Sequence, residues 1–260
     1  MRLPLYQVDA FTKRRFAGNP AAVCPLPKWL PDQTLMQIAA ENNLAETAYF
    51  VAEPDGYRLR WFTPAVEVDL CGHATLASAY VLMDCLGFGG NQVTFHSRSG
   101  PLTVGRSGDL YTLDFPSRPG ATQPADAALA RALGAVPTAI LAARDTMCVF
   151  ESAAQVQALR PNMEALTALA PFAFIATAPG DDCDFVSRFF APKQGINEDP
   201  VTGSAHCTLT PYWSARLGKA NLYARQISAR GGELWCEDRG DRVRISGHGA
   251  LYLTGFIEID

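Results

Sequence analysis

The feature that most constrains the fold of this 260-residue chain is a pattern that occurs twice. The first copy reads Arg-Trp-Phe-Thr-Pro at residues 60–64, followed by Asp-Leu-Cys-Gly-His-Ala-Thr-Leu at 69–76. The second reads Arg-Phe-Phe-Ala-Pro at 188–192, followed by Asp-Pro-Val-Thr-Gly-Ser-Ala-His at 199–206. The copies begin 128 residues apart (188 − 60), close to half of the chain, which predicts two similar halves. A cleft between such halves is the natural place for a site.

Strands are expected along most of the chain, because short runs rich in valine, tyrosine, phenylalanine and threonine recur at close intervals. Helices are fewer, and apolar spacing places them at 32–42, 73–86, 124–133, 161–169 and 204–217. Asp32 is expected to cap the first of them. The strands do not alternate regularly with helices, so the predicted fold class is α+β.

Two of these helices begin at the repeated glycines. The helix over 73–86 is apolar on nearly every side, so we expect it to be enclosed, and Pro211 should kink the helix over 204–217. If both helix starts open into the cleft, their free N–H groups and positive dipole ends would hold an anion. A substrate carboxylate would fit such a place.

Composition and charge exclude several classes of protein. Twenty-two basic and 26 acidic side chains leave a net charge of −4, which provides no overall attraction for nucleic acid or an anionic membrane. The longest mainly apolar tract, 166–178, is too short to span a bilayer. The seven cysteines are an odd number without a Cys-x-x-Cys pair, which favours reduced thiols. No export signal is visible, so we expect a cytoplasmic protein with no membrane or nucleic-acid partner.

No cofactor and no metal are expected. The glycines at 87–90 follow a helix instead of opening one, so they do not form a dinucleotide loop. His206 and Cys207 are neighbours and cannot chelate one metal from the same helix face. His96 and His248 have no companions at ligand spacing in the sequence.

Four segments together resemble the phenazine biosynthesis F-type (PhzF-like) isomerase family: 16–20 (Phe-Ala-Gly-Asn-Pro), 43–48 (Asn-Leu-Ala-Glu-Thr-Ala), 71–75 (Cys-Gly-His-Ala-Thr) and 198–205 (Glu-Asp-Pro-Val-Thr-Gly-Ser-Ala). The resemblance implies the diaminopimelate epimerase-like fold, with two pseudo-symmetric β-barrel-like halves that each wrap around a central helix and hold the site between them. We place these halves at 1–116 and 117–260, with the final strand, about 250–260, able to return to the first half.

The resemblance also implies three catalytic residues. Glu46 would be the acid/base, and its apolar neighbours would raise its pKa toward the working pH. His73 would bind or protonate the substrate, with the helix dipole favouring its neutral form. Asp199 would contact polar substrate groups or tune Glu46 or His73. The residues by themselves are also consistent with a salt-bridged or solvent-facing Glu46, a His73 that caps its own helix, and an Asp199 in a plain turn.

Substrate binding is assigned by the same resemblance to His73 and to four further residues at the two helix starts: Gly72, Thr202, Gly203 and Ser204. The glycines would allow close approach of the backbone to a ligand, or would simply form tight turns. Ser204 could equally be an ordinary helix cap.

Cys71 suggests a different mechanism, because racemases of the same fold use one cysteine from each half. The equivalent position in the second copy is Val201 or Thr202, so the partner thiol is missing. A small buried cysteine is therefore the favoured interpretation.

The predicted function is that of a cofactor-independent isomerase, which moves a proton on a small cyclic or amino-acid-like carboxylate by glutamate acid/base catalysis. The alternatives are a cysteine-dependent racemase or epimerase of an amino or hydroxy acid, and a non-catalytic protein that binds small acids. The resemblance further implies a homodimer.

Overall fold

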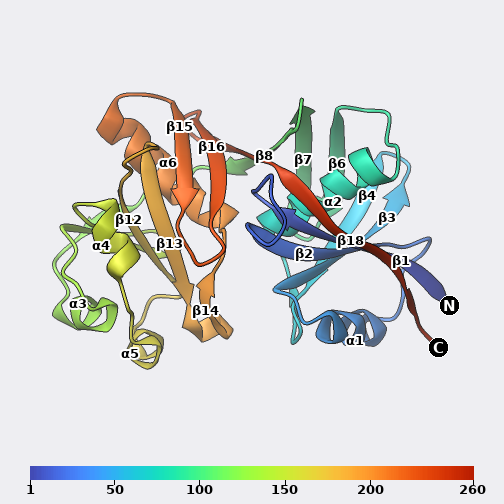
Figure 1. Cartoon of the computed structure of the whole chain (residues 1–260), viewed down its shortest axis with the longest axis horizontal. Helices are drawn as coiled ribbons and strands as arrows, with labels where there is room; N and C mark the ends of the chain where they lie inside the picture. The colour runs from blue at the N-terminus through green and yellow to red at the C-terminus, as the bar shows by residue number, and fades with distance from the viewer. The chain divides into compact units, whose positions relative to one another are not determined.

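The computed structural model describes residues 1–260, and the chain divides into two compact units. Unit 1 comprises Met1–Asp114 and Ser246–Asp260, and unit 2 comprises Phe115–Ile245. The last strand, β18 (Gly249–Glu258), lies in unit 1, where it pairs antiparallel with β1 (Arg2–Ala10). Figure 1 follows the chain from its blue N-terminus to its red C-terminus. None of the helices combines the length and the apolar character needed to cross a membrane.

Unit 1 is built on a mixed sheet. Besides β1 and β18 it contains β2 (Asn19–Pro25), β3 (Glu46–Glu53), β4 (Gly56–Phe62), β5 (Glu67–Val68), β6 (Gln92–Ser97), β7 (Gly100–Ser107) and β8 (Leu110–Pro116), the last of which runs into the boundary with unit 2. β2 is antiparallel to β1 but parallel to β3, and β4 is parallel to β6. The other pairs, from β3 with β4 to β7 with β8, are antiparallel.

The helix α2 (Gly72–Tyr80) lies enclosed in unit 1 (Figure 1). Every residue from His73 to Ala79 is buried, and the helix contacts β1, β2, β3, β7 and β18. The buried hydroxyls of Thr75 and Ser78 donate hydrogen bonds to carbonyls one turn earlier, so that they remain satisfied without water. A π-helical turn, η1 (Val81–Cys85), continues α2. The expected enclosed helix over 73–86 is thus an α-helix followed by a π-turn.

The helix α1 (Asp32–Asn42) has the bounds expected from the sequence and contacts β3 and β4, with Leu35, Ile38 and Ala39 buried. The expectation that Asp32 caps it is wrong: no side chain caps this helix, which begins after Pro31. The Asp32 carboxylate instead accepts a hydrogen bond of 2.9 Å from Arg60.

Unit 2 contains short helices between some of its strands. Its strands are β9 (Ala121–Gln123), β10 (Ala139–Ala142), β11 (Thr146–Val149), β12 (Phe174–Pro179), β13 (Phe185–Ala191), β14 (Ile196–Asp199), β15 (Asn221–Gln226), β16 (Gly232–Asp238) and β17 (Arg242–Gly247), which runs into the boundary. Its helices are α3 (Ala127–Leu133), α4 (Ala153–Ala158), α5 (Met163–Ala168), the 3₁₀ turn η2 (Pro192–Gln194) and α6 (Gly203–Leu217). The strands are mostly antiparallel, with β11–β12 and β13–β15 parallel.

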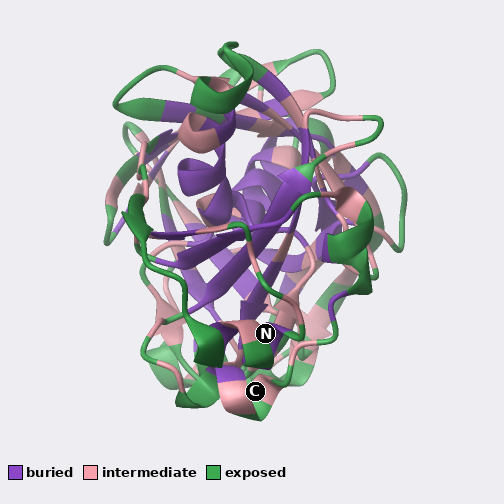
Figure 2. Cartoon of the chain, turned by 90° about the vertical axis from the view of Figure 1, so that its left-hand side faces the viewer, coloured by how far each residue is buried: buried purple, intermediate pink, exposed green.

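The core of unit 2 joins its short helices to the sheet. Leu129 of α3, Val156 of α4 and Leu166 of α5 are buried in one cluster with Phe174 and Phe190 from the strands. Figure 2 shows buried residues gathered in the strands, while exposed residues concentrate in the connections. Burial of these apolar side chains fixes the helices on the sheet.

The helix α6 runs without interruption from Gly203 to Leu217 although Pro211 lies inside it. Proline has no N–H group, so Pro211 cannot donate to the carbonyl of Cys207 one turn earlier. The backbone N–H of Arg118 takes this place and donates to the Cys207 carbonyl at 2.9 Å. A buried carbonyl that the helix itself cannot satisfy is therefore satisfied by another segment of unit 2.

The repeated sequence forms the same structure in each unit. In unit 1, Arg60 of β4 makes a two-pronged ion pair with Glu67 of β5, at 2.7 and 2.8 Å. In unit 2, Arg188 of β13 pairs in the same way with Glu198 of β14, at 2.7 and 2.9 Å. Each guanidinium also lies over the phenylalanine two residues ahead, at 5.0 and 4.9 Å from the ring centre. The repeat therefore encodes one strand-turn-strand motif, used twice.

Candidate active site

Glu46 and His73 form a buried acid/base pair in unit 1. Glu46 is the first residue of β3, and His73 is the second residue of α2, next to Gly72, with which the helix begins. Glu46 Oε2 lies 3.1 Å from His73 Nε2, and only 14% and 8% of the two side chains are exposed. The fold thus brings together two of the three residues that were predicted to be catalytic.

The charges of this pair differ from those expected. Burial opposes ionisation of Glu46, but the charge of His73 and hydrogen bonds from His73 and Cys71 lower the pKa of the carboxyl below its ordinary value. Burial likewise opposes a charged His73, but Cys71 and Glu46 raise the pKa of the imidazole well above its ordinary value. The predictions of a raised Glu46 pKa and a neutral His73 are therefore wrong. A full charge 3.1 Å away outweighs both burial and the partial charge of a helix end.

Cys71 is the third member of this cluster. It immediately precedes α2, is buried and forms no disulfide. Its Sγ lies 3.4 Å from His73 Nδ1. Burial, aided by the nearby Glu46 charge, raises the pKa of the Cys71 thiol to about 11, so the group is a neutral thiol at neutral pH.

Asn19 also contacts this cluster, a contact that sequence reasoning missed. It is the first residue of β2, is fully buried, and its side-chain Nδ2 lies 3.3 Å from His73 Nδ1. The preceding Gly18 has a φ of 65°, and a Cβ there would meet the carbonyl oxygen of Ala10 at 2.2 Å. Glycine is therefore required to turn the chain into β2. The sequence signal for Asn19 is the Gly-Asn-Pro segment, which belongs to the family motif at 16–20 but has no role assigned in the sequence analysis.

The predicted residues of unit 2 lie in one stretch of chain, between the end of β14 and the start of α6. Asp199 ends β14, Thr202 precedes α6, and Gly203 and Ser204 are the first two residues of that helix. No side chain caps α6, so Ser204 is not an ordinary capping serine. The Thr202 hydroxyl donates instead to Asp199 Oδ2.

Gln226, at the end of β15, holds this group in place and was missed from the sequence. It is buried, and its Oε1 accepts the backbone N–H of Thr202 at 2.8 Å. Its Nε2 donates to the Asp199 carbonyl at 2.8 Å and to the Thr202 hydroxyl at 3.2 Å. One amide therefore fixes the backbone that leads into α6.

His206 does not add a second acid/base group. It lies one turn into α6, where its Nδ1 is 2.8 Å from the Thr202 carbonyl. Burial lowers the pKa of this fully enclosed imidazole to about 4, so it is neutral at physiological pH.

The sequence shows no companions at ligand spacing for His96 and His248, but the fold brings carboxylates from other segments close to both. His96 Nε2 lies 3.4 Å from Asp55, and Glu53 completes a cluster with them. His248 Nδ1 lies 3.4 Å from Asp109.

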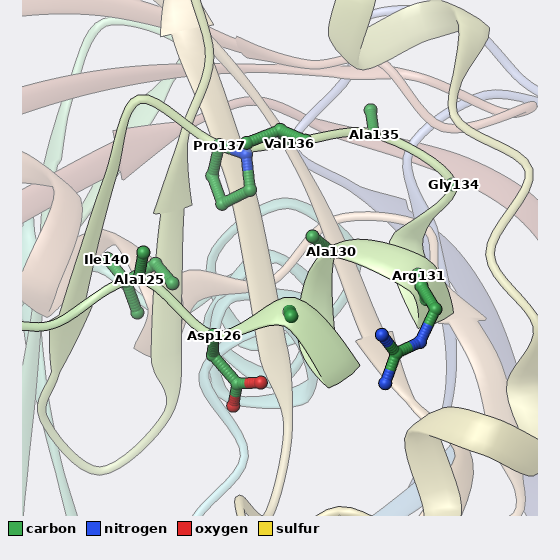
Figure 3. Close-up of a pocket in the computed structure, with 10 residues that line it drawn as sticks. Ala125, Asp126, Ala130, Arg131, Gly134, Ala135, Val136, Pro137 and Ile140 are labelled. Atoms are coloured by element: carbon green, nitrogen blue, oxygen red, sulfur yellow. The ribbon is translucent and has the colours of Figure 1, made fainter.

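Unit 2 also contains a cavity of about 640 Å³. The outer face of α3 and the segment from Gly134 to Pro137 border it (Figure 3). Its lining is mostly apolar, and Asp126, one of its two charged residues, accepts hydrogen bonds from the first N–H groups of α3. None of the predicted site residues lines this cavity.

Comparisons with known proteins agree with the sequence resemblance. Residues 8–255 match the family model PhzC-PhzF, described as phenazine biosynthesis-like protein. A protein of Pseudomonas aeruginosa named as an uncharacterized isomerase is 50% identical, with both chains covered completely. A human protein named phenazine biosynthesis-like domain-containing protein is 40% identical, with 98% of this chain and 99% of the human protein covered.

Comparison with solved structures identifies the fold. The crystal structure of a PhzF-family protein from Enterococcus faecalis is 46% identical over all of both chains and superposes with a TM-score of 0.98. A hydroxyproline epimerase from Agrobacterium vitis shares only 11% identity, but superposes with a TM-score of 0.62 over 98% of this chain and 92% of that one. This second likeness shows a common α+β, epimerase-like fold, as predicted. The chain therefore belongs to the phenazine biosynthesis-like (PhzC-PhzF) protein family.

Proposed function

We propose that this protein is a cofactor-independent isomerase, which moves a proton on a small carboxylate-bearing cyclic or amino-acid-like substrate. Relatives named as isomerases support the isomerase class. The proposed proton transfer is supported by the Glu46–His73 pair. In this pair a carboxylate and an imidazolium are in contact and largely shielded from solvent. Such a pair supplies a base and an acid without a further group.

In the proposed reaction the Glu46 carboxylate removes a proton from a substrate carbon beside a π-system. The electron pair of the broken C–H bond moves into that π-system, and Glu46 returns the proton to another carbon. The oxidation state of the substrate does not change. The His73 imidazolium donates a hydrogen bond to the negative charge that develops on the substrate.

Two opposing effects set the pKa of Glu46. The positive charge of His73 keeps Glu46 ionised at rest. Once Glu46 is protonated it carries no charge, and burial then favours this neutral form. Burial thus offsets part of the stabilisation that His73 gives the carboxylate, and the net result is a pKa below the ordinary value of a glutamate.

For unit 2 we propose a binding role. The first N–H groups of α6, at Gly203 and Ser204, would hold the substrate carboxylate, since a helix start attracts anions. Asp199 and Thr202 would contact polar substituents of the substrate. The start of α6 supports this role, because its N-cap residue, Thr202, makes no side-chain capping hydrogen bond.

The test is incorporation of deuterium from D₂O, measured by mass spectrometry. Candidate acids are first chosen by their ability to stabilise the protein thermally. We expect Glu46→Gln to slow exchange by about 10²-fold or more. The matched control is Glu53→Gln, at the other end of β3, which should exchange like the wild type. Equal exchange by Glu46→Gln and wild type would exclude Glu46 as the base. Binding of an acid with no exchange in the wild type would instead indicate a non-catalytic binding protein.

The alternative of a Cys71-dependent racemase gives the opposite result. The buried, neutral thiol supports Glu46 rather than Cys71 as the base. We therefore expect Cys71→Ser to retain exchange. Loss of turnover in a folded Cys71→Ser protein, with exchange retained in Glu46→Gln, would establish the cysteine mechanism.

A further inference from the structure

The cluster at the start of α2 contains three different kinds of metal ligand. A carboxylate oxygen of Glu46, the sulfur of Cys71 and a ring nitrogen of His73 all lie within 4.8 Å of one another. Thiolate, imidazole and carboxylate are the three side-chain groups that bind zinc in proteins. The sequence did not reveal this set, because Glu46 comes from a different segment than Cys71 and His73.

The spacing of these atoms is close to that of a zinc site. Zinc bonds of about 2.0–2.3 Å in a tetrahedron place neighbouring ligand atoms about 3.3–3.6 Å apart. Here His73 Nε2 lies 3.1 Å from Glu46 Oε2 and 4.0 Å from Cys71 Sγ. Small side-chain rotations therefore suffice. Three protein ligands would leave the fourth position for water or for a ligand carboxylate.

The surroundings also provide an outer partner for the histidine. A histidine that binds zinc through Nε2 usually donates its Nδ1–H to a neighbouring oxygen. The side-chain amide of Asn19 lies 3.3 Å from His73 Nδ1. When Nδ1 carries a proton, a half-turn of this amide presents its oxygen to that proton. Asn19 would thus fix the ring with Nε2 toward the metal.

We propose that Glu46, Cys71 and His73 form a zinc-binding site, with the Cys71 thiolate as one ligand, and that bound zinc blocks proton transfer by Glu46. Zinc replaces the proton of the Cys71 thiol and one proton of the His73 imidazolium, and both protons pass to solvent. No oxidant or reductant is involved. The inhibitory part rests on the proposed function, whereas binding of the metal does not.

A second cluster in the same unit provides an internal control. Glu53, Asp55 and His96 also have ligand atoms within 4.8 Å of one another. This cluster lacks a thiol, the Asp55 side chain is 78% exposed, and Glu53 already pairs with Arg58 at 3.5 Å. It should bind a divalent ion more weakly and without the spectrum of a thiolate ligand.

The binding test is titration of the reduced protein with Co²⁺, followed by displacement with Zn²⁺ in competition with a chromogenic chelator. We expect one equivalent of Co²⁺ to give a thiolate-to-cobalt absorption band, which Zn²⁺ abolishes. Cys71→Ala should remove the band. It should also weaken zinc binding by more than roughly 10–100-fold, which is the usual effect of losing a group that only hydrogen-bonds to a metal ligand. His96→Ala and Cys85→Ala, which leave the cluster intact, should retain the band.

Two results would overturn the site: no thiolate band in the wild type, or an unchanged band in Cys71→Ala. Circular dichroism checks the fold of that variant, and His73→Gln provides a second test if it fails to fold. The inhibitory part is tested by adding zinc to the deuterium exchange assay. Stoichiometric binding without inhibition would leave the metal site standing and would refute Glu46 as the base.

Discussion

His73 Nε2 lies 3.1 Å from Glu46 Oε2, and this contact determines the charge of both residues. Removal of the carboxylate takes away one of the two groups that raise the pKa of the buried His73, and Cys71 remains. Burial then favours the neutral imidazole.

We expect Glu46→Gln to lower the pKa of His73 from its raised value toward the ordinary value for histidine. The measurement is an NMR titration of the His73 ring, assigned by comparison with a His73→Gln spectrum. A ring that still titrates above its ordinary range in Glu46→Gln would show that another group holds the charge.

The same pair predicts how stability depends on pH. The contribution of Glu46, whose pKa is lowered, is present above about pH 4.5 and is lost as the pH falls through its folded pKa. The contribution of His73, whose pKa is raised, is fully present below about pH 6.5 and is lost as the pH rises through its folded pKa. The stability of wild type relative to Glu46→Gln should therefore be greatest between these values. Urea denaturation across the pH range measures it, and a constant difference would contradict the ion pair.

Gln226→Leu should destabilise unit 2. The substitution leaves the buried Thr202 N–H and Asp199 carbonyl without their partner, at about 1–3 kcal/mol for each unsatisfied group. The control is Gln123→Leu, because the exposed Gln123 makes only a long contact of 3.4 Å. Urea denaturation compares the two. A Gln226→Leu protein as stable as Gln123→Leu would mean that the amide does not hold the segment before α6.

Arg188→Lys should reduce stability more than Arg60→Lys. Each substitution loses a two-pronged ion pair with a glutamate, which is worth about 1.5–3 kcal/mol. Arg188 also donates to the carbonyls of Val156 and Leu159 at the end of α4, contacts that lysine cannot keep together with the glutamate. Thermal unfolding of the two variants measures the difference. Equal effects would show that these carbonyl contacts add no more than the further contact of Arg60 with the exposed Asp32.

Gly18→Ala should destabilise unit 1 and disturb Asn19. The new Cβ would collide with the Ala10 carbonyl oxygen and would occupy a positive φ, which by itself costs about 1–3 kcal/mol. Gly108→Ala is the matched control, since its φ of 61° is similar but no atom lies within 4 Å of the new Cβ. Denaturation should give Gly18→Ala a clearly lower free energy of unfolding than the control. Equal stabilities would mean that the close approach to Ala10 is easily relieved.

Much of the architecture could be predicted because it depends on residues that are close together in the sequence. The repeated Arg-aromatic-Phe-x-Pro segments predicted two similar motifs, and the apolar spacing of α1 gave its bounds. The strand β6 also carries a local pattern, because Val93 and Phe95 alternate inward. The strand β14 carries no such pattern, since Ile-Asn-Glu-Asp becomes a strand only by pairing with β13.

The candidate site was predictable in its residues but not in its electrostatics. The family motifs indicated Glu46 and His73, yet the neighbours of Glu46 in the sequence suggested burial alone. The partner that reverses its pKa shift comes from α2, and only the fold brings it within contact. Asn19 and Gln226 were missed for the same reason, because each acts on a segment far from it in the chain.

The proline in α6 links the folding of two distant segments. The carbonyl that Pro211 leaves unpaired is satisfied only when the backbone of Arg118 docks against it. The helix therefore cannot satisfy all of its own backbone groups. The hydrogen bonds of its middle turn are complete only after the entry segment of unit 2, which contains Arg118, has reached its final position. A fragment that begins beyond residue 118 would carry an unpaired carbonyl in its core, so any dissected or circularly permuted form of unit 2 should keep that entry segment.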